Sequence, residues 1–250
     1  MNALRMIGNG PHKVLCLHGW FGSASGWGPW AEVLDPDRFG WAFMDCRGYG
    51  ARLAEEGGYT MAEIATDAIA AADALDWPRF SLVGHSMGAM AMQRVLLDAP
   101  GRVRKLVAVT PVPASGVPFD EPTWAFFSSA AGSAEARRGI IDYTTGKRLT
   151  PTWLTQMVRH SVANSTPEAF GAYLTAWAKT DFAAELGHPD TPLLALVGEH
   201  DPALGEATTR ATYLASYPNA RLEVLANAGH YPMFETPVAM AAAIERFLAE

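Results

Sequence analysis

The stretch Gly84-His85-Ser86-Met87-Gly88 decides the fold of this 250-residue chain, because it places a G-x-S-x-G motif between two regular elements. An apolar, strand-like run precedes it at residues 80–83, and a helical pattern follows at residues 89–97. A serine on a sharp strand-to-helix turn projects from the backbone with its hydroxyl exposed. Such a turn crowds the neighbouring backbone, so the two glycine positions tolerate almost no side chain. This context predicts that Ser86 is a nucleophile and not part of an ordinary Gly/Ser-rich turn.

Composition places the chain among globular proteins of one large or two small domains. Apolar residues make up 49% and charged residues 18%, which is ordinary for this class. The net charge is −7 and no run of Lys or Arg exceeds two residues, which disfavours a nucleic-acid partner. No apolar stretch approaches the ~18 residues of a membrane span, so we expect no membrane partner either.

Residues 1–8 lack the long apolar segment of a signal peptide. Cys16 and Cys46 each lie in an apolar, strand-like run, and we interpret them as free thiols of a cytoplasmic protein. The chain contains no C-x-x-C or H-E-x-x-H motif, and its seven histidines are scattered. We therefore expect no metal and no cofactor. Nothing in the sequence indicates an oligomeric state.

Short apolar runs alternate with helical patterns along most of the chain. Strands are predicted at residues 14–17, 41–44, 80–83, 106–109, 193–197 and 222–225. Helices are predicted at residues 61–75, 86–97, 206–215 and 238–248. This alternation predicts an α/β fold, with a mostly parallel central sheet and helices on both faces. Ligand sites in such sheets form at the carboxyl ends of the strands.

The alternation breaks between about residues 111 and 190, where a Pro-rich loop leads into aromatic-rich helical patterns. We interpret residues 112–189 as an α-helical cap inserted over the strand carboxyl ends, with residues 1–111 and 190–250 forming the core. Amphipathic helices need an apolar face in any case, so only a few of the aromatics should contact substrate. The candidates for substrate contact are Trp20 from the core and Trp124, Phe127, Trp153 and Trp177 from the cap.

A serine hydroxyl needs a base to accept its proton, and the base needs a carboxylate to orient it. His230 follows the last predicted strand, and Asp201 follows the strand at residues 193–197, so both should lie at the edge of the sheet that carries Ser86. Glu199 is the near competitor of Asp201. The order nucleophile, acid, base is the one expected of α/β-hydrolases.

Other residues compete less well for these roles. His85 neighbours Ser86 in sequence, but its side chain should point elsewhere on the tight turn. His18, His12, His160, His188 and His200 are the other histidines. Asp45 follows a strand as well, yet Arg47 comes two residues later, so an ion pair or a structural role is the better interpretation.

Five ordered motifs resemble those of the α/β-hydrolase superfamily, and specifically its cap-bearing, serine esterase-like branch. They span nearly the whole chain: His18-Gly19-Trp20, Asp45-Cys46-Arg47-Gly48-Tyr49-Gly50, Gly84-His85-Ser86-Met87-Gly88, Gly198-Glu199-His200-Asp201 and Gly229-His230-Tyr231-Pro232. The resemblance implies that Trp20 and Met87 supply backbone N–H groups to an oxyanion hole, each typically contributing ~3 kcal/mol in the transition state. Relatives fit a hairpin before the first core strand, whereas only about a dozen residues precede it here, so an edge strand should be missing or very short.

The serine at the elbow argues against the dehalogenase and epoxide-hydrolase branches, which use aspartate there. The motifs predict a hydrolase that cleaves small-molecule carboxylic esters with small or medium, mostly apolar acyl groups. The aromatic cap and the cluster of Trp20, Trp27 and Trp30 motivate this substrate class. His18-Gly19-Trp20 is also similar to the oxyanion loop of pimeloyl-carrier methyl esterases.

Two alternatives share the same triad: a lactonase, or a hydrolase of carbon–carbon bonds in ring-cleavage products. The second needs cationic groups for a dienoate carboxylate, and the conceivable sources are Arg47, Arg52, Arg94, Arg137 and Arg138. A third alternative is a ligand-binding, receptor-like member of the fold with slow hydrolysis, because fold does not fix function.

Overall fold

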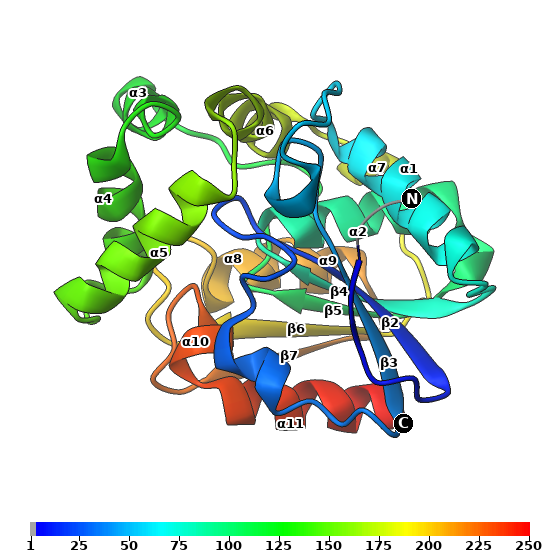
Figure 1. Ribbon diagram of the computed structural model, residues 1–250. Helices are drawn as coiled ribbons and strands as arrows, with labels where there is room; N and C mark the ends of the chain where they lie inside the picture. Colours follow the sequence, from blue (N-terminus) through cyan, green and yellow to red (C-terminus); the bar gives the residue numbers. More distant parts are fainter. Residues whose placement is uncertain (1–3) are drawn as a thin grey trace.

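A computed structural model describes residues 4–250, and it contains one sheet of seven strands (Figure 1). The strands are β1 (Leu4–Ile7), β2 (His12–Leu17), β3 (Phe39–Met44), β4 (Phe80–His85), β5 (Val103–Val109), β6 (Leu193–Gly198) and β7 (Ala220–Leu225). Their order across the sheet is β1-β3-β2-β4-β5-β6-β7. All neighbours pair in parallel except β1, which runs antiparallel to β3 at one edge. The predicted mostly parallel α/β fold is thus confirmed.

All six predicted strands are present. Two begin at the predicted residue, and four begin two or three residues earlier. β1 has four residues and is the very short edge strand that was expected. Residues 1–3, which belong to the predicted core and to the N-terminal segment inspected for a signal peptide, lie outside the described residues.

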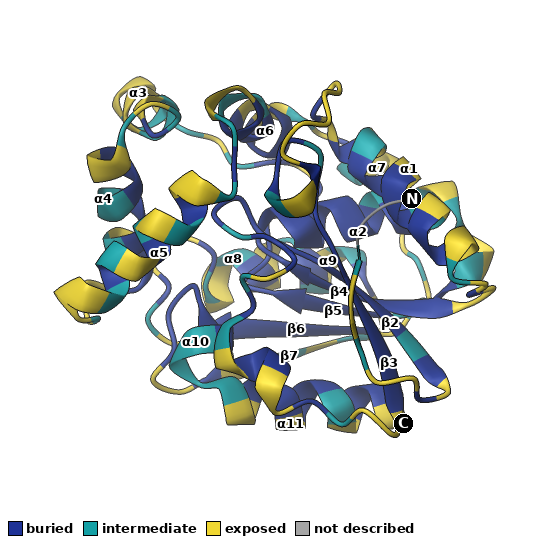
Figure 2. Cartoon of the chain, in the orientation of Figure 1, coloured by how far each residue is buried: buried dark blue, intermediate teal, exposed yellow. Residues whose placement is uncertain are grey.

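Helices cover both faces of the sheet, which is why the central strands are buried along their length (Figure 2). α1 (Met61–Ala74) and α2 (Met87–Asp98) pack together on one face. α11 (Pro237–Ala249) packs with the 3-10 helix η1 (Gly28–Glu32) on the other. No helix of residues 4–250 is long and apolar enough to cross a membrane.

The helix predicted at residues 206–215 is divided into α8 (Glu206–Ala211) and α9 (Tyr213–Ser216). Thr212, with φ −117° and ψ −73°, interrupts it. The short helices α10 (Pro232–Glu235), η2 (Gly50–Arg52) and η3 (Pro100–Arg102) were not predicted, because elements of three or four residues carry too little periodicity to be recognised.

The segment between β5 and β6 is helical, as predicted. It contains α3 (Glu121–Ser129), α4 (Ala134–Thr144), α5 (Pro151–Ala163), α6 (Pro167–Lys179) and α7 (Ala183–Leu186). α3 to α6 each begin at a side-chain N-cap that accepts the N–H three residues on; the caps are Asp120, Ser133, Thr150 and Thr166. These four helices lie together at one end of the molecule, in green and yellow-green in Figure 1.

The junction of β4 and α2 leaves no room for side chains at its glycines. A Cβ built on Gly88 would overlap the carbonyl oxygen of Leu17 at the end of β2. A Cβ on Gly84 would meet the backbone of Gly88 and Ala89 across the turn. Helix α2 therefore approaches β2 as closely as two backbones can, and only glycine permits this approach.

We predict that Gly88→Ala lowers the free energy of unfolding by more than about 2 kcal/mol, because the new methyl group must displace backbone and not a flexible side chain. Gly101 is the matched control, since a Cβ there meets nothing within 4 Å. Gly101→Ala should change stability by less than about 1 kcal/mol. Urea denaturation of both variants makes the measurement. Equal effects at the two positions would show that the close approach is not a constraint.

Candidate active site

Ser86 sits at the turn between β4 and α2 in a strained backbone conformation, with φ 52° and ψ −114°. A non-glycine residue at such a φ persists only where the surroundings enforce it. Here the Ser86 N–H donates to the Val109 carbonyl at 2.9 Å, and the Ser86 carbonyl accepts from the N–H groups of Ala89 and Val112. These bonds tie the turn to the end of β5 and leave the side chain at the carboxyl edge of the sheet.

His230 and Asp201 are in direct contact. His230 Nδ1 and Asp201 Oδ2 are 2.6 Å apart, and both residues are buried. The second oxygen of Asp201 accepts from the N–H groups of Ala203 and Leu204. Burial disfavours the ionised carboxylate, but His230 and these two amides outweigh it and hold the pKa of Asp201 below its usual value. Asp201 is therefore a carboxylate suited to fixing the tautomer and orientation of the His230 ring.

The backbone of His230 is held from both the sheet and the inserted helices. Its N–H donates to the carbonyl of Thr144, the last residue of α4, at 3.1 Å. Its carbonyl accepts from the Thr110 hydroxyl at 3.1 Å and from His85 Nε2 at 2.9 Å. The position of the His230 ring thus depends on α4 as well as on the core.

The expectation that the His85 side chain points elsewhere was wrong. Its ring lies 5.0 Å from the ring of His230, between centroids, and bonds to the His230 carbonyl. Burial, together with the neighbouring His230, lowers the pKa of His85 to about 3, so the ring is neutral. The tight turn directs the Ser86 hydroxyl to one side. His85 is the last residue of β4, and its ring points instead beneath the loop that carries His230.

The competing acids lie elsewhere. Glu199 is half-exposed, and its carboxylate accepts the N–H of Asn227. Asp45 accepts the N–H groups of Ala24 and Ala51, which bears out its structural role, although Arg47 is not its partner. Asp201 is the acid that the fold places against His230.

The other histidines contact residues other than Ser86, Asp201 and His230. His12 bonds to Ser81, and His160 bonds to Ser23. His18 Nε2 accepts the N–H of Cys46. His188 lies near the Ser216 carbonyl, and His200 lies 3.6 Å from Glu199.

The backbone N–H groups of Met87 and Trp20 remain available beside Ser86. Met87 is the first residue of α2, so its N–H has no acceptor within the helix. Among residues 4–250, no hydrogen bond occupies the N–H of Trp20. A Cβ built on Gly19 would lie 3.1 Å from Ser86 Cβ, which shows how closely the loop after β2 approaches the serine.

The loop at Trp20 is fixed by two hydrogen bonds. The Tyr49 hydroxyl donates to the Trp20 carbonyl at 2.9 Å. The Trp20 indole N–H donates to the carbonyl of Phe170 in α6 at 2.7 Å, and the two rings stack with centroids 4.1 Å apart. Trp20 therefore joins the core to the inserted helices.

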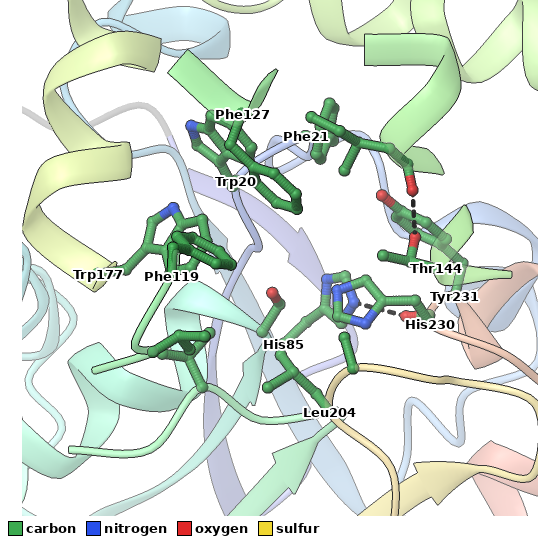
Figure 3. Close-up of a pocket in the computed structure, with 15 residues that line it drawn as sticks. Trp20, Phe21, His85, Phe119, Phe127, Thr144, Trp177, Leu204, His230 and Tyr231 are labelled. Carbon is green, nitrogen blue, oxygen red and sulfur yellow. Dashed lines mark hydrogen bonds between the residues drawn. The ribbon is translucent and has the colours of Figure 1, made fainter. Parts of the chain in front are cut away.

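Ser86 and His230 line one cavity whose walls are mostly apolar (Figure 3). An aromatic cluster, formed by Trp20, Phe119, Phe127 and Trp177, occupies one side in the view of Figure 3. Thr144, His230 and Tyr231 occupy the other. Among the described residues, no Asp, Glu, Lys or Arg lines the cavity.

Three of the five aromatics predicted to contact substrate line this cavity: Trp20, Phe127 and Trp177. Trp124 does not, because its ring packs beneath the ammonium of Lys179 at 3.7 Å. Trp153 does not either, since it packs against Tyr231 and Phe234. The assignment of these two to substrate contact has no support in their positions, and both serve to pack the inserted helices.

The tryptophans at 27 and 30 are buried against each other and against Phe43, away from the cavity. Sequence reasoning also missed several lining residues, among them Phe119, Ile140, Thr144 and Tyr231. Tyr231 carried a usable signal, because it follows His230 directly. Thr144 carried none, since only the docking of α4 brings it to this cavity.

The five arginines that were considered as partners for a carboxylate all have other partners. Arg47, Arg52 and Arg94 form ion pairs with acidic side chains. Arg137 is buried and bonds to Ser161 and Ser165, and Arg138 bonds to Thr155. None of them lines the cavity.

Known proteins of this architecture match the chain over nearly its full length. A family model described as "alpha/beta hydrolase fold" matches residues 13–237. A pimeloyl-(acyl-carrier protein) methyl ester esterase of Nitrosomonas europaea is 29% identical, over 94% of this chain and 94% of the relative. The 3-oxoadipate enol-lactonase 2 of Acinetobacter baylyi is 26% identical, over 80% and 75% respectively.

A solved esterase from Exiguobacterium antarcticum superposes with a TM-score of 0.89 at 18% identity, covering 99% of this chain and 95% of that one. At this identity the likeness speaks for the fold alone. The family match, which spans the sheet from β2 to β7, the Ser86 turn and the loop of His230, establishes the family. The chain belongs to the α/β-hydrolase fold family.

Proposed function

We propose that this protein is a serine hydrolase that cleaves carboxylic esters with small or medium, mostly apolar acyl groups. In this proposal Ser86 is the nucleophile, His230 the general base and Asp201 the carboxylate that orients it. The observation that carries the proposal is the 2.6 Å contact between His230 and Asp201 at a cavity that Ser86 also lines. The named relatives, an ester esterase and an enol-lactonase, support the reaction class.

The first half of the reaction acylates the serine. His230 Nε2 accepts the proton of the Ser86 hydroxyl while Ser86 Oγ attacks the carbonyl carbon of the ester. The resulting oxyanion is stabilised by the N–H groups of Trp20 and Met87, which are fixed before the reaction begins. The tetrahedral intermediate collapses, His230 gives its proton to the alkoxide oxygen, and the alcohol leaves.

The second half releases the acid. His230 accepts a proton from a water molecule, which attacks the carbonyl carbon of the acyl-enzyme. The second intermediate collapses to the carboxylic acid and regenerates the Ser86 hydroxyl. Asp201 stabilises the imidazolium form of His230 in both halves and does not itself take the proton.

The walls of the cavity favour a neutral substrate. A carboxylate buried among apolar side chains without a cationic partner carries a large desolvation penalty. Because no Lys or Arg among the described residues lines the cavity, a carbon–carbon hydrolase acting on dienoate acids is disfavoured. A lactone is a cyclic ester and fits the same chemistry, so lactones belong in the substrate screen.

We propose further that residues 112–189 act as a cap domain on a core of residues 1–111 and 190–250. Supporting this division, Ile140, Phe127 and Trp177 of the inserted helices form part of the cavity wall. The hydrogen bonds of Thr144 to His230 and of Trp20 to Phe170 attach the cap directly to the site.

We predict that the protein hydrolyses a p-nitrophenyl ester series from acetate to decanoate with an optimum at one chain length. Ser86→Ala should reduce kcat by about 10⁴-fold or more, because the nucleophile is lost. Circular dichroism checks that the variant is folded. Retention of most activity in folded Ser86→Ala would refute the assignment of the nucleophile. Lack of turnover by the wild-type protein across both esters and lactones would instead favour a binding protein.

Asp201→Asn should lower kcat by roughly 10³- to 10⁴-fold with little change in KM, because the amide favours the wrong tautomer of His230. Glu199→Gln is the matched control: this acid is near in sequence but bonds to Asn227. Its kcat should remain within about twofold of wild type, as for a surface polar change. Steady-state kinetics on the preferred ester decides between the acids, and the opposite ranking would make Glu199 the orienting group.

A further inference from the structure

Two hydroxyl groups interrupt the apolar wall of the cavity on the side of His230, and the mechanism above uses neither of them. They belong to Thr144, at the end of α4, and to Tyr231, the residue after His230. Figure 3 shows both side chains on the side of the cavity opposite the aromatic cluster. Burying hydroxyl groups beside an apolar cavity is costly unless they form hydrogen bonds.

Tyr231 is held rigidly. Its ring meets the rings of His230, His85 and Trp153 with centroids 5.2, 5.6 and 5.8 Å apart. Burial, reinforced by the nearby negative charges of Asp201 and Glu235, raises the pKa of the Tyr231 phenol, which stays protonated at any working pH. A fixed, neutral phenol offers one donor and one acceptor in a defined place.

The Thr144 hydroxyl lies in the same part of the cavity wall as Tyr231. Its single proton is donated within α4, to the carbonyl of Ile140 at 3.0 Å or of Ile141 at 3.2 Å. Toward a neighbour such as the Tyr231 hydroxyl, the Thr144 oxygen can therefore act only as an acceptor. The phenol oxygen keeps an acceptor site, and its proton can turn to a ligand oxygen instead.

Three of the other side-chain nitrogens of the wall already form hydrogen bonds. The Trp20 indole donates to Phe170, His85 donates to the His230 carbonyl, and His230 Nδ1 pairs with Asp201. The indole nitrogen of Trp177 is buried without a hydrogen-bond partner, and its ring belongs to the aromatic cluster on the opposite side of the cavity. On the side of His230, Tyr231 and Thr144 thus supply the two hydroxyl groups that the reaction leaves unused. Neutral His85, whose Nε2 carries the proton, offers only an acceptor at Nδ1.

The role of His230 as the donor of a proton to the leaving oxygen identifies which part of a bound ester lies next to Tyr231 and Thr144. The leaving oxygen must approach His230 to receive its proton, so the alcohol part lies on the side of His230. The oxyanion donor at Trp20 lies with the aromatic cluster, which leaves that side to the apolar acyl group. Tyr231 follows His230 in the chain and packs edge-on against its ring, so it borders the alcohol part.

We propose that Tyr231 and Thr144 form a subsite for the alcohol part of the substrate, where they bind a neutral hydroxyl group beyond the scissile bond. This inference rests on the proposed ester hydrolysis and narrows its substrates to esters of hydroxylated, uncharged alcohols. A site built to hydrogen bond a hydroxyl discriminates against the analogue that lacks it, because its own polar groups are then left unpaired.

The test compares 2-hydroxyethyl butanoate with n-propyl butanoate, which differ by a hydroxyl in place of a methyl group. The ratio of their kcat/KM values should fall about tenfold in Tyr231→Phe, the loss typical of one hydrogen bond between neutral groups. Thr144→Val should lower the ratio in the same direction. Thr145→Val is the matched control, because Thr145 makes the same kind of bond to Ile141 but does not line the cavity.

A second pair of esters tests whether Tyr231 contacts the alcohol part of the substrate and not the acyl part. Ethyl methoxyacetate and ethyl butanoate differ in the acyl part alone, and the ratio of their kcat/KM values should be the same in wild type and Tyr231→Phe. A shift in the acyl ratio, an unchanged alcohol ratio in both cavity variants, or an equal shift in Thr145→Val would each overturn the proposal.

A binding readout separates this proposal from the proposed function. Quenching of tryptophan fluorescence gives the Kd of both butanoate esters for Ser86→Ala and for Ser86→Ala combined with Tyr231→Phe. If wild type cleaves neither ester but the ratio of the two Kd values shifts in the double variant, the subsite stands and ester hydrolysis fails. If the wild-type protein cleaves both esters and neither ratio shifts, hydrolysis stands and the subsite fails.

Discussion

The close approach of helix α2 to strand β2 beneath Ser86 is the constraint on which the rest of the site depends. Gly88 lies against the carbonyl groups of Leu17 and His18, so the start of α2 and the loop after β2 are held together. This packing brings the start of α2, which carries Met87, against the loop after β2, which carries Trp20. It also stabilises the strained backbone of Ser86, since the turn cannot relax without separating helix and sheet.

His230, the proposed base, is positioned by a different arrangement, which extends beyond the core. His230 is bonded to Asp201 through its ring, to His85 and Thr110 through its carbonyl, and to Thr144 of α4 through its N–H. Trp20, bonded to Phe170 of α6, makes a second connection. The inserted helices therefore shape the cavity and also help to set the positions of the proposed base and of one proposed oxyanion donor.

The sequence predicted the sheet and the residues around Ser86 well, because both rest on local signals. Strand periodicity located the six longer strands, and the order of Ser86, Asp201 and His230 followed from their places after strands. The cavity wall was predicted less well, because it depends on how helices dock. Trp124 and Phe127 lie on the same helix, yet only Phe127 faces the cavity. The direction of the His85 ring depends on a contact 145 residues away.

The central claim is that the fold activates one serine, and labelling with a fluorophosphonate followed by peptide mass mapping tests it most directly. Ser23 is an internal comparison, because its hydroxyl also lies 3.0 Å from a histidine nitrogen, that of His160, but outside the cavity. The account predicts a single adduct on the peptide that contains Ser86, formed at a much lower rate in Asp201→Asn. An unlabelled but folded protein, or an adduct on another serine, would contradict it.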